Sequence, residues 1–136
     1  MTSVSFDGKA ALIVEDDTTS LTLMSRMMTQ VGFKAVGTAR DGSDALHLLD
    51  HNDYDVILCD IQMDGMSGLD FAREFKNNFR MRYSPKKITT PIIFISSSRD
   101  PKMVAQAKRL GAKGYLLKPF HKNSLVQRLT IAGVHH

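Results

Sequence analysis

Short apolar runs alternate along this chain with longer segments in which apolar residues recur every three or four positions. The runs lie at residues 10–14, 34–39, 55–60, 91–95 and 114–117, of which 34–39 predicts a weaker strand than the others. Uninterrupted runs this short are typical of parallel strands that are covered on both faces. The longer spacing predicts a helix after each strand, the last from about Lys122 to Ile131.

Five strands that alternate with five helices predict an α/β fold, a parallel sheet with helices on both faces. The doubly wound, flavodoxin-like order 2-1-3-4-5 would place strands 1 and 3 side by side. With 136 residues the chain has the size of one domain, whose core we expect at about 9–131. Residues 76–90 have no clean period and hold five basic residues, so we expect an extended basic loop there.

Acidic side chains end two of the expected strands. The third strand ends in Asp60, and the first runs into Glu15, Asp16 and Asp17. The expected strand order places Glu15 and Asp16 beside Asp60. Carboxylates that converge in this way need a proton or a cation, and hard oxygen ligands favour Mg²⁺. A carboxylate beside such a metal can attack phosphorus and form an acyl phosphate.

Two further polar residues end the remaining central strands. Ser96 ends the fourth strand and Lys118 follows the fifth, where a hydroxyl and an ammonium could contact two phosphoryl oxygens. Two residues beside the acidic ones have structural rather than chemical interpretations. Asp17 suits a helix N-terminus, where the dipole favours a negative charge. Cys59 precedes Asp60, points to the opposite face of its strand and is interpreted as a buried, inert thiol.

Taken together, these segments resemble the receiver domain of bacterial two-component response regulators, the family of the chemotaxis response regulator. The resemblance is carried by residues 13–17, by Asp60 with Met63 and residues 65–68, and by residues 91–97, 111–112 and 115–120. It implies that Asp60 is a phosphoacceptor. The phosphoryl group would come from a histidine kinase or a histidine phosphotransfer protein.

The resemblance also implies a metal site. Glu15 and Asp16 would be the acidic pair, with Asp16 a direct Mg²⁺ ligand. Asp60 and the backbone carbonyl of Gln62 would complete the ligation by the protein. One departure lies close by, because Asp64 stands where many members of the family have proline.

The remaining implied roles concern a switch. Ser96 would move to the phosphoryl group, Lys118 would pair with it, and Tyr115 would swing inward when Ser96 shifts. The small Ser97 would leave the phosphoryl group accessible, and the peptide before Pro119 would be cis. Such a switch is driven by one new dianion.

The expected output is a change in affinity for a downstream protein partner. It would act through the face formed by strand 4, helix 4, strand 5 and helix 5. A phosphorylation-dependent homodimer through this face is an open alternative. The resemblance implies no enzyme with turnover, only slow self-dephosphorylation.

Three other functions compete with this one. A phosphatase of the haloacid dehalogenase type also uses a strand-end aspartate, Mg²⁺ and a lysine, but needs a second aspartate where Gln62 stands. A flavodoxin-like cofactor binder needs a hydroxyl-rich loop after strand 1, where this chain has three acids. A receiver-like binding module that is never phosphorylated is the third.

Charge and composition bear on nucleic-acid binding, membrane insertion and cellular compartment. Residues 1–72 hold 4 Lys and Arg against 12 Asp and Glu, whereas residues 73–136 hold 14 against 2. A basic half can bind nucleic acid, but without zinc-finger spacing, a helix-turn-helix pattern or interleaved aromatics we expect no direct contact. No apolar run approaches the roughly 20 residues of a membrane span. A single cysteine fits a reducing compartment, so we expect a cytoplasmic protein.

Overall fold

The computed structural model describes residues 5–77 and 85–134 and contains one five-stranded parallel sheet. The strands are β1 (Ala10–Val14), β2 (Ala35–Ala39), β3 (Val56–Asp60), β4 (Ile92–Ser96) and β5 (Gly114–Leu117). Their order is β2-β1-β3-β4-β5, and every neighbouring pair is parallel. The expected doubly wound fold is therefore confirmed.

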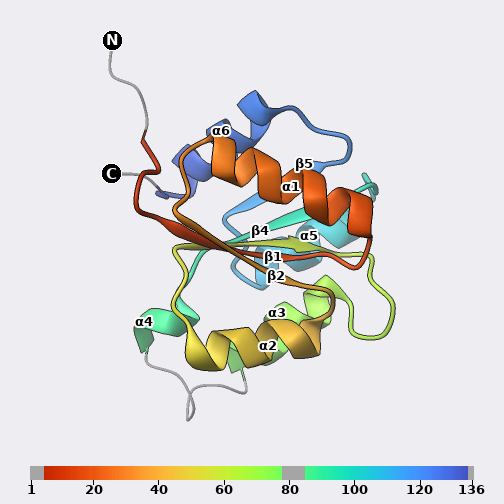
Figure 1. The fold of residues 1–136 in the computed structure, drawn as a ribbon. Coiled ribbons are helices and arrows are strands. Elements are labelled where there is room, and N and C mark those ends of the chain that lie inside the picture. Colours follow the sequence, from red (N-terminus) through yellow and green to blue (C-terminus); the bar gives the residue numbers. More distant parts are fainter. Residues whose placement is uncertain (1–4, 78–84, 135–136) are drawn as a thin grey trace.

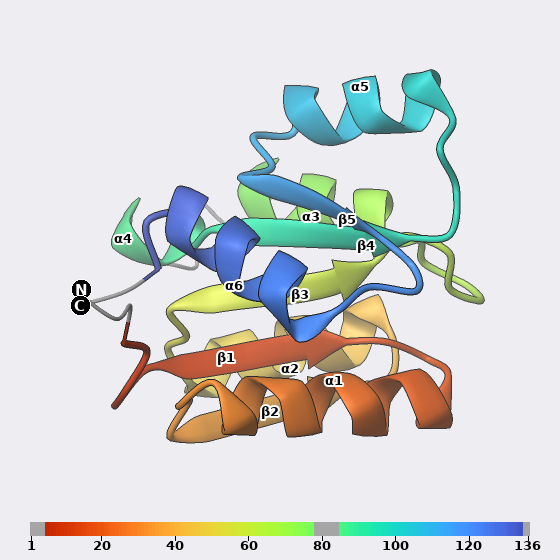
Figure 2. The same ribbon diagram turned by 90° about the horizontal axis from the view of Figure 1, so that it is seen from above.

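Helices cover both faces of the sheet (Figures 1 and 2). They are α1 (Thr18–Gln30), α2 (Gly42–His51), α3 (Gly68–Asn77), α4 (Pro85–Ile88), α5 (Pro101–Arg109) and α6 (Lys122–Ile131). Helices α1 and α6 pack on one face, whereas α2, α3 and α5 pack on the other. The last helix has the bounds that its apolar spacing predicts.

Alternate residues of the central strand face the two sides of the sheet. Ile57 and Cys59 belong to the cluster under α2, α3 and α5, whereas Val56 and Leu58 belong to the cluster under α1 and α6. All five residues of β3 are buried. This is why the strand reads as an uninterrupted apolar run, since neither of its faces meets water.

The segment expected as a loop at 76–90 is partly helical. Lys76 and Asn77 end α3, and Pro85–Ile88 form the short helix α4, whereas residues 78–84 lie outside the described part. Proline suits the first turn of a helix. Ile88 packs against the apolar cluster under α2, and Lys87 Nζ donates to the carbonyl of Leu49 at 2.6 Å. These long-range contacts leave no periodic signal in the sequence.

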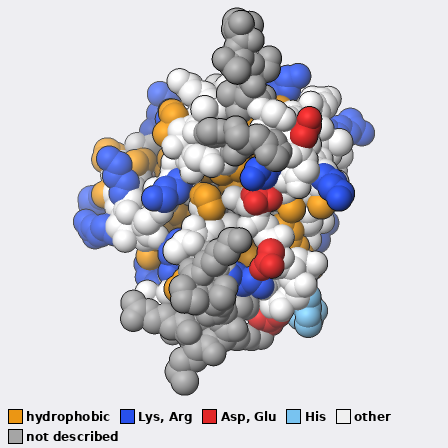
Figure 3. Space-filling view, turned by 90° about the vertical axis from the view of Figure 1, so that its left-hand side faces the viewer, with side chains coloured by type: hydrophobic (Ala, Val, Ile, Leu, Met, Phe, Trp, Pro, Cys, Tyr) orange, Lys and Arg blue, Asp and Glu red, His pale blue; other side chains and the backbone are white. Residues whose placement is uncertain are grey.

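The charge difference between the two halves of the sequence does not separate acidic from basic side chains on the face drawn in Figure 3. Lys and Arg side chains spread over much of the face drawn in Figure 3, and acidic side chains lie between them near its centre. The fold explains the mixing, because strands from both halves lie side by side in one sheet. Among the described residues, no helix is long and apolar enough to cross a membrane.

Candidate functional site

The carboxyl ends of the parallel strands bring four polar residues to one edge of the sheet. Asp60 ends β3 and Ser96 ends β4, whereas Glu15 and Lys118 directly follow β1 and β5. Backbone pairing continues into the site, because Lys118 N–H donates to the carbonyl of Ser96 at 2.9 Å. Open α/β sheets bind their ligands at this edge, where the order of the strands reverses.

An acidic cluster occupies the end of β1 and β3. Glu15, Asp16 and Asp60 each offer a carboxylate oxygen, and these oxygens lie within 4.8 Å of one another. Glu15 is fully buried and Asp60 is 3% exposed. Glu15 Oε2 and Asp60 Oδ1 are buried, and neither has a hydrogen-bond partner among the described residues. Buried oxygens without partners are costly, and a hard divalent cation such as Mg²⁺ would satisfy them.

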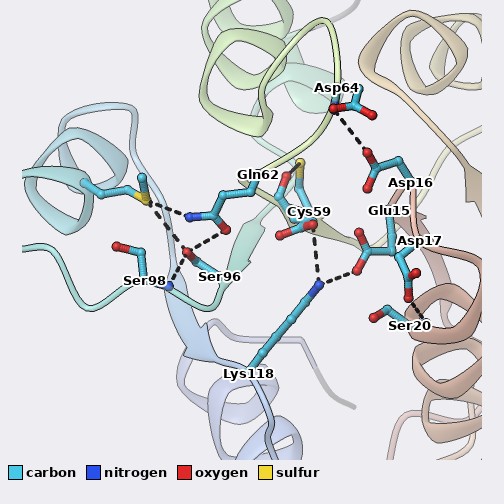
Figure 4. A network of polar contacts seen from close by, with 12 residues as sticks. Glu15, Asp16, Asp17, Ser20, Cys59, Gln62, Asp64, Ser96, Ser98 and Lys118 are labelled. Atoms are coloured by element: carbon cyan, nitrogen blue, oxygen red, sulfur yellow. Dashed lines mark hydrogen bonds and ion pairs between the residues drawn. The ribbon is translucent and has the colours of Figure 1, made fainter.

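Lys118 supplies one positive charge to this cluster. Its ammonium donates to Glu15 Oε1 and lies 3.4 Å from Asp60 Oδ2. Burial alone would lower the pKa of Lys118, but the hydrogen bond to Glu15 and the nearby carboxylate charges outweigh it and raise that pKa. Figure 4 shows Lys118 reaching into the site beside Glu15.

One lysine does not balance the acids. Burial raises the pKa of Asp60 most, followed by the hydrogen bond that its protonated form can donate to Glu15 and by the charge of Glu15, so that the pKa rises from 3.8 to about 7 although Lys118 opposes the shift. The side chain of Asp60 is thus poised between a protonated and an ionised form near neutral pH. A cation bound to the three carboxylates would favour the ionised form.

The loop after β3 closes over the cluster. Asp64 N–H donates to Asp16 Oδ2 at 3.1 Å (Figure 4). A proline at position 64 would lack this N–H, so the departure from the family pattern adds a contact to the acidic pair. Gly68 then brings the chain back against β3, because a Cβ there would lie 2.2 Å from the carbonyl oxygen of Asp60. No pattern in the sequence indicates this close approach of Gly68 to Asp60.

The hydrogen bonds of the Ser96 hydroxyl are made with residues outside the acidic cluster. It donates to Gln62 Oε1 at 2.9 Å and accepts from Ser98 N–H at 3.0 Å. Figure 4 shows Gln62, Ser96 and Ser98 on one side of Lys118, with the acidic residues 15–17 on the other. The sequence pointed only to the backbone carbonyl of Gln62, and the contact of its side chain with Ser96 was not anticipated.

Tyr115 is connected to Ser96 through Ser98. Its ring is half-buried on β5, and its hydroxyl donates to the carbonyl of Ser98 at 3.1 Å. The peptide between Lys118 and Pro119 is cis, as the resemblance implies.

Asp17 and Cys59 have the structural roles that the sequence predicts for them. Asp17 caps α1 by accepting from Ser20 N–H at 2.8 Å, and this backbone hydrogen bond lowers its pKa. Cys59 is fully buried, and burial raises the pKa of its thiol well above the ordinary value. Neither residue contributes a ligand atom to the acidic cluster.

Comparisons with known proteins agree with this geometry. Chemotaxis protein CheY-3 of Vibrio cholerae is 27% identical over 118 residues, which cover 87% of this chain and 86% of that protein. The structure of chemotaxis protein CheY4 of Vibrio cholerae has a TM-score of 0.78 and 29% identity, covering 90% of this chain and 97% of that one.

A third relative shares the fold. The receiver domain of the sensor histidine kinase PA1611 of Pseudomonas aeruginosa has a TM-score of 0.78 and 24% identity, covering 93% of this chain and 98% of that one. Its structure has a magnesium ion coordinated in the active site cleft.

The family relationship itself rests on nearly the whole chain. The sequence model of the response regulator receiver domain matches residues 11–130, which include every strand and helix of the described structure except the first residue of β1 and the last of α6. The chain therefore belongs to the response regulator receiver domain family and is a phosphoacceptor signalling domain.

Proposed function

We propose that Asp60 is the phosphoacceptor of this domain and that its phosphorylation switches a partner-binding face. The observation that carries the proposal is Asp60 itself, whose buried Oδ1 has no hydrogen-bond partner among the described residues and whose Oδ2 lies 3.4 Å from Lys118. A carboxylate with one unengaged oxygen at the carboxyl edge of the sheet is a suitable nucleophile toward phosphorus.

The phosphodonor is a histidine kinase or a histidine phosphotransfer protein. A carboxylate oxygen of Asp60 attacks the phosphorus of a phosphohistidine, and the P–N bond breaks as the new O–P bond forms. The imidazole nitrogen of the donor takes the electron pair. Lys118 donates to a phosphoryl oxygen and offsets part of the charge that arrives with it.

Mg²⁺ fits the acidic cluster. Asp16, Asp60 and the backbone carbonyl of Gln62 would hold the ion, with Glu15 beside it. When bound, Mg²⁺ neutralises charge and holds a phosphoryl oxygen as a Lewis acid. The orphaned oxygens of Glu15 and Asp60 support this assignment, because a cation would satisfy them.

The switch acts through Ser96 and Tyr115. After phosphorylation the hydroxyl of Ser96 donates to a phosphoryl oxygen instead of to Gln62. Ser98 accepts the hydroxyl proton of Tyr115 and donates to Ser96, so a shift of Ser96 changes the surroundings of Tyr115. The output face consists of β4, α5, β5 and α6, and it changes its affinity for a downstream protein partner in the cytoplasm.

The alternative enzyme has less support. A haloacid dehalogenase phosphatase needs an acid two residues after its nucleophile, and Gln62 occupies that position with its side chain bonded to Ser96. We therefore assign slow loss of the phosphoryl group and no turnover on a substrate. The chain also retains each group that phosphorylation needs, which argues against a receiver-like module that is never phosphorylated.

Phosphoryl uptake tests the proposal directly. We expect the protein to take up one phosphoryl group from a small acyl phosphate in the presence of Mg²⁺, as measured by intact mass. Asp60→Asn should take up none, and EDTA should abolish uptake by the native protein. Equal uptake by native protein and Asp60→Asn would show that another residue is modified.

Analytical sedimentation with and without beryllofluoride measures whether activation changes the oligomeric state. A dimer that forms only with beryllofluoride and Mg²⁺ would favour self-association through the output face. A protein that remains a monomer would favour a separate partner.

A further inference from the structure

The hydroxyl proton of Ser96 is already used in the unphosphorylated structure. Ser96 is fully buried, and its oxygen lies 2.9 Å from Gln62 Oε1, to which it donates. A hydroxyl has only one proton to donate. While that proton goes to Gln62, Ser96 has none for a phosphoryl oxygen on Asp60.

The amide of Gln62 is held in turn by Met103 of α5. Gln62 Nε2 lies 3.4 Å from Met103 Sδ, which is itself 3.7 Å from Ser96 Oγ. The amide therefore directs its oxygen at the hydroxyl and its nitrogen at the sulfur. This arrangement connects the loop after β3, the end of β4 and the first turn of α5.

We propose that the Gln62 side chain, supported by Met103, is a clasp that holds Ser96 in the resting state. The clasp must open before Ser96 can bind a phosphoryl group, so Gln62 and Met103 are positioning residues that set the threshold of the switch. The inference rests on the proposed phosphorylation of Asp60. Gln62 is exposed overall, so its side chain can turn into solvent without opening the core.

Gln62 and the phosphoryl group compete for the proton of the Ser96 hydroxyl, and this competition decides whether the clasp opens. A hydrogen bond to an ionised acceptor is about twice as strong as one between neutral groups, so a phosphoryl group wins the hydroxyl from Gln62. The bonds of the clasp still have to be broken, and their loss subtracts from the affinity for the phosphoryl group. Removing the clasp should therefore tighten beryllofluoride binding by about three- to tenfold.

The test uses a variant that keeps the length of the side chain. Gln62→Met removes the amide, and Gln127→Met makes the same change at an exposed position on α6. Beryllofluoride affinity is titrated at saturating Mg²⁺, and Mg²⁺ affinity is measured separately for each variant. We expect tighter beryllofluoride binding for Gln62→Met, a smaller effect for Met103→Leu, and no change for Gln127→Met.

A double-mutant cycle separates the clasp from a direct effect of Gln62 on the site. If Gln62 acts through the hydroxyl of Ser96, Gln62→Met should have no effect on beryllofluoride affinity in a Ser96→Ala background. An equal effect in both backgrounds would overturn the proposal, because Gln62 would then act on the phosphoryl group or the metal directly. Unchanged affinity in the native background would overturn it as well.

A second measurement needs neither metal nor phosphoryl group. The amide of Ser98 donates to Ser96 Oγ, so its ¹⁵N–¹H resonance reports on the position of that hydroxyl. We expect this resonance to shift in metal-free Gln62→Met and to stay in place in Gln127→Met. A native protein that takes up no beryllofluoride would defeat the proposed function, whereas an unmoved Ser98 resonance in Gln62→Met would defeat the clasp.

Discussion

Opposing effects act on the pKa of the Asp60 carboxyl group. Burial and the neighbouring Glu15 favour its neutral form, whereas Lys118 favours its ionised form, and the balance raises its pKa to about 7. A proton and the proposed Mg²⁺ would thus compete for the same oxygens.

The raised pKa of Asp60 makes the stability of the metal-free protein depend on pH. The unfolded chain releases this proton near pH 3.8, whereas the folded chain keeps it to about pH 7. Between these values the folded state binds more protons, so the free energy of unfolding falls as pH rises. In EDTA, we expect Tm of native protein to drop relative to Asp60→Asn between about pH 4 and pH 7. Parallel Tm curves for the two proteins would contradict the shift.

Adjacent acids should differ in their response to Mg²⁺. Asp16 belongs to the acidic cluster, whereas Asp17 caps α1 and asparagine caps a helix about as well. We expect Mg²⁺ to raise Tm of native protein and of Asp17→Asn, but to raise that of Asp16→Asn much less. Thermal unfolding across a Mg²⁺ titration measures this. A full response in Asp16→Asn would remove Asp16 from the metal site.

Glycine and lysine residues fix the loops and short elements around the sheet. Gly68 begins α3, and the backbone of Asp60 leaves no space for a side chain there. On the far edge, Lys87 of α4 donates to the carbonyl of Leu49 near the end of α2 and pairs with Asp53 at 3.3 Å. A carbonyl in the last turn of a helix lacks an intrahelical partner, so this contact satisfies it.

The close approach at Gly68 predicts a large effect of one methyl group. In Gly68→Ala the Cβ would meet the carbonyl oxygen of Asp60 at 2.2 Å, and backbone would have to move. We expect the free energy of unfolding to fall by about 1–3 kcal/mol and phosphoryl uptake to slow. The control is Gly114→Ala, whose Cβ would make ordinary van der Waals contacts, the nearest of them with the Ile93 side chain at 3.4 Å. Urea unfolding that finds both variants equally stable would contradict this placement.

At the scale of the whole molecule, one sheet separates two apolar clusters. Phe71 of α3 lies in one cluster and Leu125 of α6 in the other, and both are fully buried. The strands contribute alternate residues to the two clusters, so neither can lose its packing without exposing the sheet. The domain should therefore unfold as one cooperative unit.

Truncating a buried side chain in either apolar cluster tests whether the domain unfolds cooperatively. Phe71→Ala and Leu125→Ala should each lower the free energy of unfolding by about 2–5 kcal/mol. Both variants should keep a single urea transition with coincident circular dichroism and tyrosine fluorescence. Leu23→Ala is the control, because Leu23 is 52% exposed. Two separate transitions in either core variant would show that the two faces unfold independently.

The sequence by itself determined the strands, the fold class and the residues at the carboxyl edge of the sheet. Apolar runs bounded by polar residues mark β1, β3, β4 and β5, because a strand buried on both faces admits few polar side chains. Once the strand order is known, parallel geometry alone brings Glu15, Asp60 and Lys118 together.

Tertiary structure alone decided how these groups are engaged. The bond between Lys87 of α4 and Leu49 of α2, the close approach of Gly68 to Asp60 and the bond between Gln62 and Ser96 all join residues from separate elements. Such contacts depend on how loops and helices pack against the sheet, and they leave no periodic pattern along the chain. The sequence thus names the groups at the site, whereas packing decides which of them hold one another before phosphorylation.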